Sequence, residues 1–292
     1  MLKCFEDQNL SERLDREPFQ FTHKLLGHPT LSLENLTKVI PALPKEDVFY
    51  SKGLMKTADN FEKAFNQRPK DFSIEEVIET IRVSNSYIMV SSPESDRSFS
   101  PLYRELIADV EALMHDRGVG TKAIDPKLYL FIASPNSVTP FHIDRYSTFL
   151  MQFRGSKEVS VFQPWDERVV SSSDREAYVA YANTQLPWSL ETDAFAKKFT
   201  FNQGDALHIP FVSGHHVRNG SEDVSISMSI IFNTQETMRW RKALTFNHAS
   251  RQLLKPLGIL PTPIGISPWR DTTKAYLQKP MRHVAKLLNN SK

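Results

Sequence analysis

The stretch VTPFHID, residues 138–144, places an imidazole and a carboxylate two positions apart in an apolar segment. Side chains of a β-strand alternate between its two faces, so His142 and Asp144 are predicted to point the same way, about 7 Å apart along the backbone. An imidazole and a carboxylate on one face can bind the same metal ion. The spacing alone is weak evidence, because 9 His and 34 acidic residues produce such pairs by chance, and a purely structural pair is the alternative.

A third metal ligand has to come from another segment. The run Gly214-His215-His216 follows the apolar stretch 207–210 and supplies two candidate histidines. Two histidines and one carboxylate occupy one side of a metal ion and leave coordination positions open on the other side. This arrangement is typical of non-haem Fe(II) sites, where O₂ and a cosubstrate bind at the open positions.

A lysine at the start of an apolar strand is the next feature. Lys157 precedes the segment 158–162, which is rich in valine and phenylalanine. A buried cation at this place would suit the far carboxylate of a dicarboxylate cosubstrate. The alternative is a lysine whose side chain extends along the strand to solvent.

The segment 224–232 alternates between apolar residues and serines. Side chains of one face of this predicted strand are Ser225, Ser227 and Ser229. Such a row of hydroxyl groups indicates either the wall of a polar pocket or the ordinary solvent face of an antiparallel strand.

Short apolar strands with polar turns dominate the middle of the chain. We expect strands at 128–132, 147–153, 158–162, 199–201, 206–209 and 224–232. The turn Arg154-Gly155-Ser156 is predicted to join two of them as a hairpin. A row of such strands is typical of a barrel or sandwich. A polar, partly helical insertion is expected at about 166–198, and an amphipathic helix at 101–117 that ends at Gly118.

Composition and charge indicate the size of the domains, the partners and the cellular compartment that we expect. The 292 residues suffice for one large domain with appendages or for two small domains. The net charge of +2 argues against nucleic acid as a partner. The single cysteine, Cys4, excludes an intrachain disulfide. Neither a signal peptide nor a run of about 18 apolar residues is evident, so we expect a cytoplasmic protein with no membrane partner.

The runs 138–144 and 152–157 resemble the JmjC and cupin-like oxygenases, which depend on Fe(II) and 2-oxoglutarate. The best-known member of this family is the asparaginyl hydroxylase that acts on hypoxia-inducible factor. In the family, a lysine fifteen residues after the first ligand histidine binds the distal carboxylate of 2-oxoglutarate, and so does a threonine three residues before that histidine. The resemblance assigns these roles to Lys157 and Thr139.

The resemblance also selects among the histidines. The pattern G-D, then I-P, then a ligand histidine five residues after the proline is matched by 204–205, 209–210 and His215, which favours His215 over His216. Two positions depart from the family: Thr148 stands where asparagine is frequent, and Ser213-Gly214 replaces an aromatic pair. These departures concern the shape of the pocket and the substrate.

The implied fold is mainly β with flanking helices around a double-stranded β-helix, that is, a jelly-roll or cupin core. We expect an N-terminal helical and mixed region packed on the core at 1–126, the core itself at 127–233 and a C-terminal helical arm at 234–292. The arm is a candidate contact for a homodimer.

The implied activity is hydroxylation of a protein or peptide side chain or of a small metabolite. Fe(II) would be held by His142, Asp144 and His215, with 2-oxoglutarate and O₂ as cosubstrates. We expect Thr148 and Ser229 to complete the 2-oxoglutarate pocket. The alternatives are a metal-dependent cupin enzyme that does not use 2-oxoglutarate, and a non-catalytic cupin-like binding or regulatory module. The roles of His216, Arg145 and Arg218 stay open.

Overall fold

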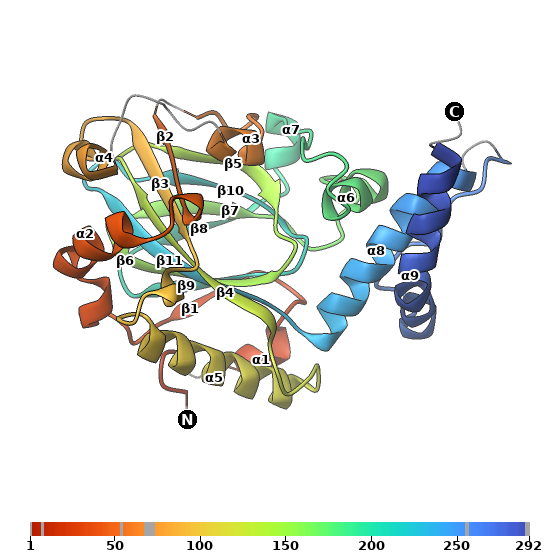
Figure 1. The fold of residues 1–292 in the computed structure, drawn as a ribbon, viewed down its shortest axis with the longest axis horizontal. Helices are drawn as coiled ribbons and strands as arrows, with labels where there is room; N and C mark the ends of the chain where they lie inside the picture. Colours follow the sequence, from red (N-terminus) through yellow and green to blue (C-terminus); the bar gives the residue numbers. More distant parts are fainter. Residues whose placement is uncertain (1, 7–8, 53–54, 67–73, 255–256, 290–292) are drawn as a thin grey trace.

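The computed structural model describes residues 2–6, 9–52, 55–66, 74–254 and 257–289, and its centre consists of two antiparallel β-sheets (Figure 1). The strands of the larger sheet are β1 (Phe19–Thr22), β2 (Val48–Lys52), β3 (Ser86–Ser91), β4 (Ile124–Ala133), β6 (Ser147–Arg154), β9 (Asp205–Ile209) and β11 (Ser225–Asn233). Those of the smaller sheet are β5 (Val138–Ile143), β7 (Lys157–Val161), β8 (Lys197–Phe201) and β10 (Gly214–Asn219).

The chain passes back and forth between the two sheets. The larger sheet has the order β1-β9-β6-β11-β4-β3-β2 and the smaller sheet the order β5-β10-β7-β8, so that β4 to β7 alternate between the sheets. This winding is that of a double-stranded β-helix. The predicted mainly β fold with flanking helices around a jelly-roll core is confirmed.

The turn at 154–156 does not form the predicted hairpin. β6 pairs with β9 and β11, whereas β7 pairs with β8 and β10. The turn instead carries the chain from one sheet to the other. A tight polar turn is compatible with either connection, which is why the local sequence predicted the wrong one.

The N-terminal part of the chain contributes strands to the larger sheet. β1 pairs with β9, with Phe19 opposite His208, and β3 pairs with both β2 and β4. The sequence-based division at residue 126 therefore separates three strands from the sheet to which they belong.

Helices flank the two sheets (Figure 1). They are α1 (Leu10–Arg13), α2 (Leu33–Ala42), α3 (Phe61–Asn66), α4 (Ile74–Thr80), α5 (Ser100–Arg117), α6 (Ser172–Val179), α7 (Leu190–Asp193), α8 (Gln235–Leu254) and α9 (Pro268–Asn289). α5 ends where predicted, at Gly118 in the left-handed conformation, whose N–H donates to the carbonyl of His115. α6 and α7 lie within the predicted insertion. In the described part of the chain, no helix is both long and apolar enough to cross a lipid bilayer.

α8 and α9 pack side by side and extend away from the sheets (Figure 1). α9 exposes large apolar side chains, including Trp269 and Tyr276. The homodimer contact expected for this arm stays a prediction.

The alternation in β11 sorts its side chains between two environments. Met228, Ile230 and Phe232 belong to an apolar cluster that also contains the buried face of α5. The serines of the opposite face, Ser227 and Ser229 among them, are buried as well. The solvent-face alternative for these serines is therefore wrong.

Stability at the 154–156 turn is expected to depend on glycine. Gly155 has φ 68°, and a Cβ built there would lie 2.6 Å from the carbonyl oxygen of Val224. The left-handed conformation costs an L-residue about 1–2 kcal/mol, and the contact with backbone adds to that cost. We expect Gly155→Ala to lower the free energy of unfolding, measured in urea, by more than Gly118→Ala does. Gly118 has φ 75°, and no described atom lies within 4 Å of a Cβ built there. Equal losses in the two variants would contradict the crowding argument.

Candidate metal centre

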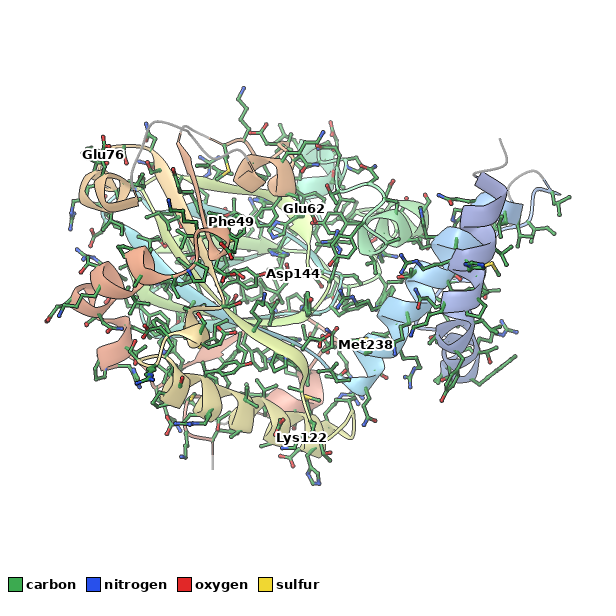
Figure 2. All side chains as sticks on the ribbon, viewed as in Figure 1. Phe49, Glu62, Glu76, Lys122, Asp144 and Met238 are labelled. Carbon is green, nitrogen blue, oxygen red and sulfur yellow. The ribbon has the colours of Figure 1, made fainter. Side chains whose placement is uncertain are left out.

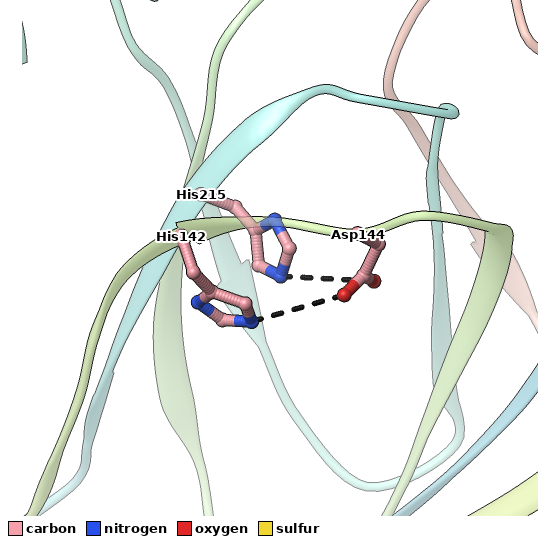
Figure 3. A group of neighbouring side chains, drawn as sticks. All are labelled: His142, Asp144 and His215. Atoms are coloured by element: carbon pink, nitrogen blue, oxygen red, sulfur yellow. Dashed lines mark ion pairs between the residues drawn. The ribbon is translucent and has the colours of Figure 1, made fainter. Parts of the chain in front are cut away.

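Three side chains from two neighbouring strands point toward one another (Figure 3). His142 lies on β5, Asp144 directly follows that strand, and His215 lies opposite His142 on β10. Nε2 of each histidine lies 3.9 Å from a carboxylate oxygen of Asp144. One ligand atom from each of the three residues lies within 4.8 Å of the other two. The structure thus brings together the three residues that the sequence analysis selects.

Hydrogen bonds to the backbone orient both imidazole rings. Nδ1 of His142 lies 2.8 Å from the carbonyl oxygen of Pro140, and Nδ1 of His215 lies 3.1 Å from that of Ser213. A carbonyl oxygen only accepts, so Nδ1 is the protonated nitrogen in the neutral form of each ring, and that form has its lone pair on Nε2. Burial lowers the pKa of His142 well below its usual value, which favours the neutral ring.

The resulting donor set is two imidazole nitrogens and one carboxylate. Such a set fits a divalent transition metal, and backbone acceptors behind ligand histidines are typical of metal sites. The carboxylate is held in place too, because the hydroxyl of Thr148 donates to Oδ2 of Asp144 at 2.7 Å. Thr148, expected in the cosubstrate pocket, therefore contacts a candidate ligand directly.

A cavity of about 340 Å³ lies between the two sheets and contains the three candidate ligands in its wall. The four residues that the sequence analysis selects for the cosubstrate also line it: Thr139, Thr148, Lys157 and Ser229. The rest of the wall includes Tyr87, Tyr129, Phe131, Leu150, Ile209, Val217, Ser227 and Ile231. One cavity therefore combines a candidate metal site with a lysine and a set of hydroxyl groups.

Lys157 is buried within this cavity. Only 7% of the residue is exposed, and its Nζ donates to the hydroxyl of Ser227 at 2.8 Å. Burial lowers the pKa of Lys157 to about 7. Within the described ranges, no carboxylate forms an ion pair with it. The alternative of a lysine that extends to solvent is therefore wrong, and its amino group is buried without a counter-ion, which disfavours the charged form.

Residues of α3 and of the insertion border the same cavity. Arg145 donates to the carboxylate of Glu62 on α3 at 2.7 Å and to the carbonyl oxygen of Tyr178 on α6 at 2.6 and 3.0 Å. Its guanidinium carbon lies 3.7 Å from the ring centroid of Tyr181. In Figure 2, Glu62 lies toward α3 and Asp144 toward the centre of the molecule. Arg145 thus joins α3 to the insertion beside a candidate ligand.

The sequence analysis did not single out the partners of Arg145. Glu62 and Tyr181 lie far from the 138–144 stretch in sequence, and neither has a local pattern that marks it. Phe61 was missed for the same reason: its ring stacks on that of His142, with centroids 3.8 Å apart and an interplanar angle of 4°.

Two of the residues without an assigned role lie outside the cavity. His216 follows His215 on β10, and its Nε2 lies 2.6 Å from Oδ1 of Asp193 on α7. Arg218 is exposed. Strand alternation explains this placement, because it sends neighbouring side chains to opposite faces.

Comparison with known proteins identifies the family. The cupin-like domain family matches residues 34–238, which is more than half of the chain and includes every strand from β2 to β11. The chain belongs to this family. The cupin-like match covers all three candidate ligands and Lys157.

Solved structures are similar to this chain at low sequence identity. The X-ray structure of Escherichia coli ycfD is 15% identical, with 96% of this chain and 68% of that chain covered and a TM-score of 0.50. Another structure of YcfD, a ribosomal oxygenase from Escherichia coli, is 12% identical over 99% of this chain and 68% of that chain, with a TM-score of 0.48. The formate complex of Lactobacillus farciminis oxalate decarboxylase is 17% identical over 38% of this chain and 25% of that chain, with a TM-score of 0.26. A comparison with curated protein sequences gives no match.

Measurements of metal binding should show which of the two adjacent histidines is a ligand. We expect His215→Ala to weaken the binding of Mn(II), a redox-stable substitute for Fe(II), by more than the roughly 10–100-fold typical of changes outside the ligand set. His216→Ala is the matched control and should keep the wild-type dissociation constant, because His216 contacts Asp193. Isothermal titration calorimetry measures both. Unchanged affinity in His215→Ala would exclude His215 as a ligand.

Proposed function

We propose that this cupin-like protein is an Fe(II)- and 2-oxoglutarate-dependent oxygenase. The observation that carries the proposal is Lys157, a buried lysine in the same cavity as two imidazoles and a carboxylate. A 2-His-1-carboxylate set leaves coordination positions open for a cosubstrate and O₂. A lysine in the same cavity provides the positive charge that the far end of a dicarboxylate requires.

His142, Asp144 and His215 would hold the iron, which when bound supplies the activation of O₂ for oxidation of a substrate C–H bond. Lys157 would bind the distal carboxylate of 2-oxoglutarate while it keeps its contact with Ser227. Thr139 and Ser229 line the cavity and offer further hydroxyl groups to this ligand.

Side chains of α3 and of the insertion cover part of the proposed site. The ring of Phe61 covers one face of the His142 imidazole. Arg145 holds α3 and the end of α6 together through Glu62 and the carbonyl of Tyr178. Keeping water out protects a reactive site from side reactions. The proposed substrate is a protein or peptide side chain or a small metabolite.

Succinate release tests the proposal. With Fe(II), ascorbate and a panel of peptides and metabolites, we expect 2-oxoglutarate to be converted to succinate and CO₂ together with hydroxylation of one panel member. Asp144→Ala should abolish this turnover, because it removes the carboxylate ligand. Asp193→Ala should retain it, because Asp193 pairs with His216 away from the cavity.

Two outcomes would contradict the proposal. Undiminished turnover in Asp144→Ala would exclude the triad as the metal site. Oxidation of a panel member without consumption of 2-oxoglutarate would favour a metal-dependent cupin enzyme of another class.

The affinity for 2-oxoglutarate should depend on pH through Lys157. The pKa of this lysine is lowered to about 7 in the empty cavity, so its ammonium form is present below that value and is lost as the pH rises through it. Above about pH 7, binding requires uptake of a proton, and we expect the affinity of the Mn(II)-loaded protein to fall by up to about tenfold per pH unit. Lys157→Met should bind weakly and with no such dependence. Lys198→Met, on the neighbouring strand β8 and half exposed, should behave like the wild type. A profile for the wild type as flat as that for Lys157→Met would contradict this assignment.

A further inference from the structure

A buried carboxylate lies behind the candidate metal centre and does not line the cavity. Asp15, between α1 and β1, is 7% exposed. Its carboxylate accepts hydrogen bonds from the hydroxyl of Ser147 at 2.7 and 2.8 Å and from the backbone N–H of Phe211 at 2.9 Å. Ser147 lies three residues after Asp144, and Phe211 lies four residues before His215. One N-terminal side chain is therefore bound to both segments that carry candidate ligands.

The imidazole of His208 extends this network to the ligand carboxylate. Its Nε2 accepts the backbone N–H of Asp15 at 2.9 Å, and its Nδ1 lies 3.1 Å from the carbonyl oxygen of Thr148. Burial lowers the pKa of His208 to about 3, so the ring is neutral and its single proton lies on Nδ1. Thr148 in turn donates its hydroxyl to Asp144. A continuous chain of hydrogen bonds and backbone thus runs from Asp15 to a candidate ligand.

The turn 210–213 provides a second connection. Val212 has φ 56°, a conformation that β-branched residues rarely adopt, and its N–H donates to the carbonyl oxygen of Asp144 at 3.2 Å. The carbonyl of Ser213 is the group that orients the ring of His215. Strain of this kind costs about 1–3 kcal/mol and persists only where the surroundings enforce it. The bond from Phe211 to Asp15 is one such constraint on the turn.

We propose that Asp15 is a positioning residue for the metal centre. Its carboxylate holds the turn 210–213 and Ser147 next to the segments that carry His215 and Asp144. Its backbone N–H holds His208, whose Nδ1 donates to the carbonyl oxygen of Thr148. Two of the three ligands would lose their fixed geometry without it. The inference rests on the metal site of the proposed function, but it does not depend on the substrate or on 2-oxoglutarate. Hydrogen-bonding partners behind metal ligands typically change metal affinity 10–100-fold when they are altered.

Asp15→Asn is the direct test. The substitution preserves the size of the side chain but leaves one acceptor oxygen where the carboxylate has two. We expect the dissociation constant for Mn(II) to rise about tenfold. We also expect the d–d absorption spectrum of the Co(II)-substituted protein to change, because the ligands no longer keep the same arrangement. A residue with a purely structural role would leave this spectrum unaltered in the folded protein.

Asp109→Asn is the matched control. Asp109 on α5 is 4% exposed, and its carboxylate accepts the backbone N–H groups of Lys3 at 3.0 Å and Cys4 at 2.6 Å. It is therefore another buried carboxylate that holds the N-terminal segment, with no connection to the candidate ligands. Its replacement should lower stability while the Mn(II) affinity and the Co(II) spectrum stay those of the wild type.

Ser147→Ala keeps the inference testable if Asp15→Asn does not fold. It removes one of the two groups that donate to the Asp15 carboxylate and should give a smaller change in the same direction. An unchanged Mn(II) affinity and Co(II) spectrum in the folded variants, or an equal change in Asp109→Asn, would overturn the role of Asp15. Absence of metal binding in the wild type is a different result and would contradict the proposed metal site itself.

Discussion

The candidate site depends on one hydrogen bond that occurs in both histidines. In each, Nδ1–H donates to the carbonyl oxygen two residues earlier in the chain. Pro140 provides that carbonyl for His142, and Ser213 provides it for His215. With Nδ1 engaged, the nitrogen of each ring that can bind a metal ion is Nε2, on the side of Asp144. The pairing of β5 with β10 then places the two rings opposite each other, with centroids 4.1 Å apart. Gly214 permits this approach, because a Cβ there would lie 2.8 Å from the ring of Phe141.

Alternation of side chains along strands predicted much of this arrangement. It correctly placed His142 beside Asp144 and separated the serines of β11 from its apolar residues. The resemblance to the JmjC and cupin-like oxygenases added Thr139 and Lys157, and both line the same cavity as the triad. These positions could be predicted because period-two alternation and ligand spacing are properties of short stretches of chain. The roles assigned to Thr139 and Lys157 stay predictions.

Pairing between distant segments could not be predicted in the same way. Nothing within residues 19–22 indicates that they form an edge strand next to β9. The sequence of the turn at 154–156 is compatible both with a hairpin inside one sheet and with a crossing from one sheet to the other. The contacts of Asp15 and Glu62 could not be predicted for the same reason. Each is an ordinary acidic residue in its local sequence, and its partners, Ser147 and Arg145, lie more than eighty residues away.

Because of the contacts of Asp15, metal binding should also affect how firmly the N-terminal segment stays attached to the rest of the protein. A cation that binds only to the converged ligands must, by thermodynamic linkage, favour every contact that their convergence requires. Those contacts include the attachment of the segment before β1 to the 210–213 turn. A bound cation would therefore reduce local opening at the N-terminal edge of the larger sheet and, with it, the exposure of that edge to proteases. Supply of the metal ion would then influence how long the protein survives as well as whether the site is occupied.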